Sequence, residues 1–188
     1  MSVATRSALA AVLVGLCCLA CETTTAPPAP EAVTGKLQDL YSRPLKLPVL
    51  APGAKCPESP PQTIGLGRLT KENDIPSSGQ GTWPFFISGS DGTGWLAGQG
   101  ALLLISPEYV GPLIVRGHQL DGSGGMPLVP ASSANSVEIA STTSTNWRQW
   151  DGQIAQGTAP GCYGLQADGF NFTSQIVIAV VPGTPGPA

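Results

Sequence analysis

The stretch "APGCYGLQADGFNFTSQIVIAVV" (residues 159–181) decides the fold class. Its composition predicts two β-strands, 161–167 and 175–181, with Pro160-Gly161 as the turn before them and a loop that begins at Asp168-Gly169. Side chains alternate along a strand, so the first strand has two distinct faces. We expect one face to carry Cys162, Gly164 and Gln166, and the other to carry Tyr163, Leu165 and Ala167.

Short strand signals precede this hairpin at regular intervals, and no segment has a clear helical period. The Gly-x-Tyr-x-Leu strand resembles the penultimate strand of immunoglobulin-like domains. We therefore expect an all-β chain that folds as an immunoglobulin-like antiparallel β-sandwich of about eight strands, and a small barrel is the alternative. The Cys–Trp–Cys spacing of antibody domains is absent. The predicted upstream strands are 63–69, 83–88, 101–106, 111–116, 126–129 and 137–140, while 94–97 is a short strand or a turn and 147–150 is a further candidate segment.

The N-terminal residues predict export. Arg6 is followed by the uncharged run "ALAAVLVGLCCLA" (residues 8–20), which is short for a transmembrane helix and ends in a small residue. This pattern predicts a signal peptide over residues 1–20. The alternative is an N-terminal membrane anchor that is not cleaved.

The signal peptide ends in "CLAC" (residues 18–21), which resembles the lipobox of bacterial lipoproteins. The resemblance implies cleavage after Ala20 and lipid attachment at Cys21, although Cys18 stands where the family usually has leucine. Residues 21–55 are rich in proline and threonine and predict a flexible tether between the lipid and a folded domain at 56–182, with a disordered tail at 183–188. The predicted location is the bacterial cell envelope, and secretion after ordinary cleavage is the alternative.

A wider resemblance covers about two-thirds of the chain. The segments "GPLIVRGHQLDG" and "WRQWDGQIAQGTAPGCYGLQADG" are similar in layout to uncharacterised domains of bacterial exported lipoproteins. That resemblance implies a fold and an extracytoplasmic location, and it brings no known activity or catalytic residue.

Cysteine usage predicts one disulfide. The chain has five cysteines, of which Cys17 and Cys18 leave with the signal peptide and Cys21 takes the lipid. Two remain in an oxidising compartment, so we expect Cys56 to pair with Cys162.

Composition excludes several classes of partner and cofactor. Charged residues are 11% of the chain and no Lys/Arg cluster is present, which argues against nucleic acid. Its glycine-rich loops lack the Gly-Lys-Ser/Thr of a phosphate-binding loop, so we expect no cofactor. A metal site is not expected, because the chain has a single histidine and its Asp-Gly pairs at 91, 121, 151 and 168 suit hairpin turns.

The sequence favours a binding or structural domain over an enzyme. Its predicted partners are the membrane, through the lipid, and an envelope polysaccharide or another envelope protein. The alternative function is carbohydrate binding through an exposed tryptophan, with Trp147, Trp150 and Arg148 as candidate contacts. A remote alternative is a hydrolase built on His118, Asp121 and Ser123, although the serine lacks the glycine that marks a nucleophile elbow.

Overall fold

The computed structural model describes residues 36–64, 78–90, 94–131, 135–141 and 146–185. The predicted signal peptide, Cys21 and the first part of the tether lie outside these residues. So do most of the predicted strand 63–69, the Asp91-Gly92 turn and the last residues of the predicted tail.

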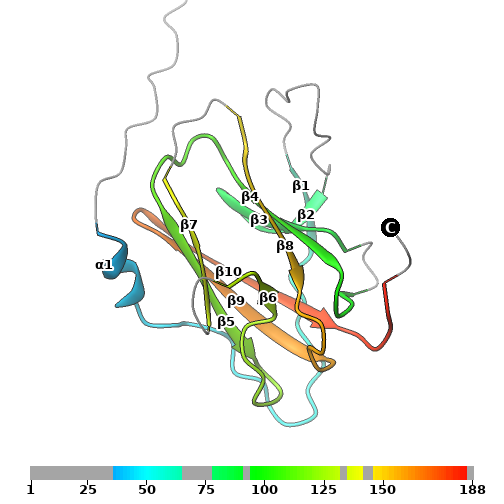
Figure 1. Cartoon of the computed structure of the whole chain (residues 1–188). Helices are drawn as coiled ribbons and strands as arrows, with labels where there is room; N and C mark the ends of the chain where they lie inside the picture. Colours follow the sequence, from blue (N-terminus) through cyan, green and yellow to red (C-terminus); the bar gives the residue numbers. More distant parts are fainter. Residues whose placement is uncertain (1–35, 65–77, 91–93, 132–134, 142–145, 186–188) are drawn as a thin grey trace, which may run out of the picture.

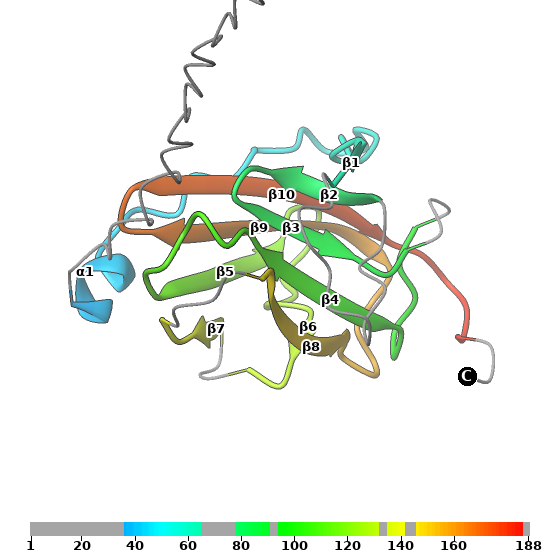
Figure 2. The same cartoon turned by 90° about the horizontal axis from the view of Figure 1, so that it is seen from above.

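Two antiparallel sheets pack face to face, which confirms the predicted β-sandwich (Figures 1 and 2). The six-stranded sheet has the order β1-β2-β3-β4-β8-β6 and the four-stranded sheet has the order β10-β9-β5-β7. Strands of the larger sheet are β1 (Pro61–Thr63), β2 (Ser78–Thr82), β3 (Phe85–Ser88), β4 (Gly100–Ile105), β8 (Arg148–Ile154) and β6 (Leu128–Val129). Strands of the smaller sheet are β10 (Phe172–Val180), β9 (Gly161–Gly169), β5 (Leu113–Gln119) and β7 (Ser136–Ile139).

The order of the central strands matches the immunoglobulin-like arrangement. The run β3-β4-β8 corresponds to strands A-B-E of such domains, and β10-β9-β5 corresponds to G-F-C. The edge strands differ, because β6 beside β8 precedes β7 beside β5 in the chain, whereas in immunoglobulin domains the strand beside C precedes strand D. The described residues form ten strands instead of about eight, partly because β1 and β2 extend the larger sheet beyond β3. The hydroxyl of Tyr163, buried in β9, donates to the carbonyl of Ala159 at 2.8 Å, which is the bond of a tyrosine corner.

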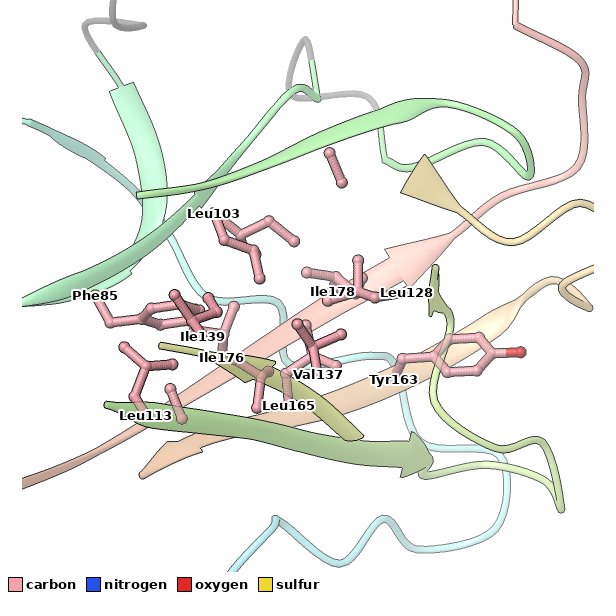
Figure 3. Packing of buried hydrophobic residues seen from close by; sticks show 14 of the residues in the cluster. Phe85, Leu103, Leu113, Leu128, Val137, Ile139, Tyr163, Leu165, Ile176 and Ile178 are labelled. Atoms are coloured by element: carbon pink, nitrogen blue, oxygen red, sulfur yellow. The ribbon is translucent and has the colours of Figure 1, made fainter. Parts of the chain in front are cut away.

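One apolar core fills the space between the sheets (Figure 3). Alternate residues of the strands point into it, and the side chains from the two sheets interdigitate. Trp95, predicted within a short strand or turn, makes a single parallel bridge to Val180 and is also buried in this core. Other core residues are Phe85, Leu103, Ile105, Leu113, Val115, Leu128, Val137, Leu165, Ile176 and Ile178.

The final hairpin is longer than the sequence predicts. Gly169 pairs with Phe172, so the turn contains only Phe170 and Asn171, and the prediction that the loop starts at Asp168-Gly169 is wrong. Asp168 stays in β9 because its buried carboxylate has several partners on the outer face of the sheet. The predicted alternation is confirmed: Tyr163 faces the core, while Gln166 faces away from it.

The N-terminal residues 36–59, here called the strap, run across the outer face of the four-stranded sheet (Figure 1). They begin with α1 (Leu37–Tyr41), whose Leu40 is fully buried. The sequence placed residues 36–55 in the tether, because its prolines prevent a long helix and its apolar residues have no period. In the structure this segment is held by hydrogen bonds to the Gln166 side chain and to a strand carbonyl, which a periodicity does not reveal. Within the described residues no helix has the length and apolar character needed to cross a bilayer.

Candidate functional site

A polar cluster lies between the strap and the outer face of the four-stranded sheet. At its centre is Asp168, which is fully buried. Its carboxylate accepts hydrogen bonds from Arg116 at 2.6 Å, from Gln166 at 2.9 Å and from Thr173 at 2.8 Å. A buried carboxylate is tolerated when charged and neutral donors surround it in this way.

Arg43 of the strap closes the cluster on one side. Its guanidinium approaches Asp168 at 4.0 Å and donates to the carbonyls of Gly169, Phe170 and Phe172 at 2.7, 2.9 and 3.1 Å. These three carbonyls surround the β9–β10 turn. Arg43 therefore fixes the strap to the end of the last hairpin.

Gln166 and Arg116 attach the neighbouring residues of the strap. The amide of Gln166 donates to the carbonyl of Pro44 at 3.1 Å and accepts from the backbone N–H of Lys46 at 2.7 Å. Arg116 donates to the carbonyl of Tyr41 at 3.1 Å. The charged and polar side chains of the cluster thus hold the strap against the sheet.

Sequence reasoning missed this cluster. Asp168 is part of an Asp-Gly pair and was interpreted as a turn residue, and Arg43 and Arg116 are far from it in the sequence. The one available signal was Gln166 on the outer face of a strongly apolar hairpin, because a polar residue there needs a partner.

The predicted disulfide holds the far end of the strap. Cys56 and Cys162 are bonded, with their Cα atoms 5.4 Å apart. The bond joins the strap to the start of β9, on the face opposite Tyr163. Antibody domains use their disulfide to link two sheets, whereas this one links an N-terminal segment to the outer face of one sheet.

The residues of the hydrolase alternative have other roles. His118 is exposed in β5, where the sequence had placed it in a turn after a strand. Both carboxylate oxygens of Asp121 accept from the backbone N–H of Cys162, at 3.0 and 3.1 Å, and Gln119 donates to the same carboxylate. Ser123 is exposed in the following loop. In the structure Asp121 therefore binds the main chain of β9, and it does not orient a catalytic base.

The candidate sugar contacts are mostly inside the protein. Trp147 is 6% exposed and packs on Phe86 with ring centroids 6.0 Å apart, and Trp150 is half-buried against the core. Arg148 is buried and donates to the carbonyls of Ala140 and Tyr109, both at 2.9 Å. Both Trp147 and Arg148 are thus engaged in packing and main-chain hydrogen bonds, and their contact with a ligand stays a prediction.

Burial also shifts the pKa values of Arg148 and of two buried tyrosines. Arg148 lies over the ring of Tyr109, 5.5 Å from its centroid. Desolvation lowers the pKa of Arg148 and raises the pKa of Tyr109, because burial disfavours the charged form of each. Burial likewise raises the pKa of Tyr163, and the charge of Asp121 raises it further.

The exposed aromatic side chain is Trp83, which the sequence assigned only to a strand. It is 51% exposed, in the turn between β2 and β3. Its ring meets Trp147 edge to face, with centroids 5.6 Å apart and planes at 88°. This contact with Trp147 restricts the position of the Trp83 ring.

A cavity of about 530 Å³ opens beside the end of the strap. Its lining includes Glu58, Gln80 and Trp95. The amide of Gln80 donates to the carbonyl of Ser59 at 2.8 Å and accepts from the indole of Trp95 at 3.0 Å. These bonds engage the Gln80 amide and the Trp95 indole. In the described part of the chain no cluster of His, Cys, Asp and Glu side chains is placed to bind a metal ion.

Comparison with known proteins returned no match: no protein-family model, curated protein or solved structure is significantly similar to this chain.

Proposed function

We propose that the chain is an exported bacterial lipoprotein that carries a lipid on Cys21 and holds a binding or structural β-sandwich at the cell envelope. The observation that carries this proposal is the Cys56–Cys162 disulfide. Structural disulfides form in oxidising compartments and are rare in the cytosol. The pairing accounts for both cysteines of the domain, and the other three lie in or directly after the apolar N-terminal run.

The attachment of the strap supports the same proposal. A domain tethered through its N-terminus experiences any pull from the membrane at the segment that follows the tether. Here those residues are held by Arg43 at one end and by the disulfide of Cys56 at the other. Such a double attachment suits a domain that is anchored at its N-terminal side.

The use of the charged side chains supports a non-catalytic role. Asp168 and Arg116 hold the strap, Arg148 binds two carbonyls, and Asp121 binds the N–H of Cys162. These charged groups are thus engaged in holding the fold together. Carbohydrate binding through Trp147 is the weaker candidate, because only 6% of that side chain is exposed.

Substitution of the lipid-acceptor cysteine tests the proposal. The full-length chain with Cys21→Ala should move from the membrane fraction to the soluble extracytoplasmic fraction of a bacterial host. The matched control is Cys18→Leu, which restores the usual lipobox residue and should leave the protein in the membrane fraction. Retention of the Cys21→Ala protein in the membrane would refute lipid anchoring and would favour an uncleaved N-terminal helix.

A further inference from the structure

Two hairpin turns lie at the same end of the sandwich. One contains Trp83 and Pro84, and the other contains Phe170 and Asn171. The hydroxyls of Thr82 and Ser174, close to the two turns, are 2.7 Å apart. We call these four turn residues the turn end of the domain.

The strap begins at the turn end as well. Arg43, two residues after the end of α1, donates to the three carbonyls around the β9–β10 turn. In both views α1 lies beside that turn (Figures 1 and 2). The chain that leads back to Cys21 therefore joins the domain at the end that carries Trp83 and Phe170.

Trp83 is the most exposed tryptophan of the domain. Its exposed fraction is 51%, whereas that of Trp95 is 1% and that of Trp147 is 6%. Phe170, in the neighbouring turn, is half-buried. The edge-to-face contact with Trp147 holds the Trp83 ring, so the ring loses little freedom when it binds a surface.

We propose that the turn end rests on the lipid surface, with the Trp83 ring in the headgroup region. This inference rests on the proposed lipid anchor at Cys21. Tryptophan is enriched at membrane–water interfaces, because its ring is apolar and its N–H remains hydrated. Residues 21–35 span at most about 50 Å when fully extended, so an anchored domain stays close to the bilayer. A short connection of this kind gives an effective concentration on the order of millimolar, at which a weak contact becomes populated.

The shape of the turn end favours a membrane over a saccharide. Trp83 lies at a two-residue turn, and three cavities in the described part of the chain lie elsewhere. One is beside Ser59 and Trp95, and the others border Asp151 of β8. A sugar site needs a concave surface with several polar groups around the ring. A two-residue turn with one half-exposed ring fits a flat lipid surface better.

Fluorescence quenching tests this contact. The mature lipidated protein is reconstituted into vesicles of phosphatidylethanolamine and phosphatidylglycerol whose acyl chains carry bromine, a quencher of tryptophan emission. We expect these vesicles to quench the wild-type protein more than vesicles without bromine do. The Trp83→Phe variant should float with the vesicles as the wild type does and lose most of the quenching. The matched control Trp150→Phe, at a half-buried residue of β8 that packs against the core, should keep it.

The outcomes separate this inference from the anchor itself. A wild-type protein that does not float with the vesicles would refute the lipid anchor, and with it the inference. A protein that floats but is not quenched, or is quenched equally with Trp83→Phe, would overturn the membrane contact and leave the anchor standing. A Trp83 emission change on addition of soluble peptidoglycan fragments, without quenching by brominated lipid, would overturn it in favour of sugar binding.

Discussion

Replacing Asp168 with asparagine tests whether the polar cluster around this residue stabilises the attachment of the strap. The substitution keeps the shape of the side chain but removes the charge that Arg116 contacts at 2.6 Å. The side chain of Arg116 is only 15% exposed, and its Nε already lacks a hydrogen-bond partner. Removing one partner of a buried ion pair costs about 3–5 kcal/mol, because the other charge is left uncompensated. Arg43 is farther away and 32% exposed, so its lost attraction adds less than about 1 kcal/mol.

We therefore expect Asp168→Asn to lower the free energy of unfolding by about 3 kcal/mol, near the low end because asparagine can still accept from Thr173. Urea unfolding of the domain measures this as a lower midpoint with an unchanged slope. The matched control is Asp151→Asn, at an exposed carboxylate of β8, which should change stability by less than about 0.5 kcal/mol. The double variant Asp168→Asn with Arg116→Met should lose less than the sum of the single variants. If Asp168→Asn and Asp151→Asn lower the free energy of unfolding by the same small amount, the stabilising role of the Asp168 cluster is refuted.

Three further predictions concern stability. Replacing both disulfide cysteines (Cys56→Ser with Cys162→Ala) should cost about 4–5 kcal/mol in urea unfolding, because the bond closes a sequence separation of 106 residues; a loss under about 1 kcal/mol would contradict this. Trp147→Ala should cost about 3–5 kcal/mol, and Trp83→Ala should cost clearly less, because Trp83 is already half in water; equal losses would show that the burial assignment is wrong. Burial raises the folded-state pKa of Tyr109 and Tyr163 above 10.0. The neutral phenols therefore contribute their whole stabilisation below pH 10.0, and this contribution is lost as the pH rises through the raised pKa values. The urea midpoint of the wild type should therefore decrease as the pH is raised above about 10, and that of Tyr163→Phe should decrease less steeply. A wild-type midpoint that stays constant in this range would exclude a contribution of the raised tyrosine pKa values to stability.

The sandwich could be predicted because its main signals are local. Alternation in residues 161–167 places Tyr163 and Leu165 on one face of the strand, and in the structure that face packs in the core. The disulfide followed from counting cysteines in a compartment that the N-terminal residues predict. Both inferences depend on patterns that a single stretch of chain contains.

The strap could not be predicted, because its attachments are long-range. Arg43 binds carbonyls of residues more than one hundred positions away, and any residue type offers a carbonyl. Asp168 looked like half of a turn because Asp-Gly favours turns locally, and four side-chain hydrogen bonds outweigh that preference. The exposure of tryptophans is equally non-local: Trp147 is covered by partners from other strands, and Trp83 is not.

The mass of the mature N-terminal peptide tests the central claim most directly. The peptide is released by protease from protein purified out of the membrane fraction of a bacterial host. The proposal predicts a peptide that begins at Cys21 and carries the added mass of a diacylglyceryl group, with a further acyl chain where the host adds one. An unmodified Cys21 at the N-terminus, or a peptide that begins at Met1, would contradict lipid anchoring.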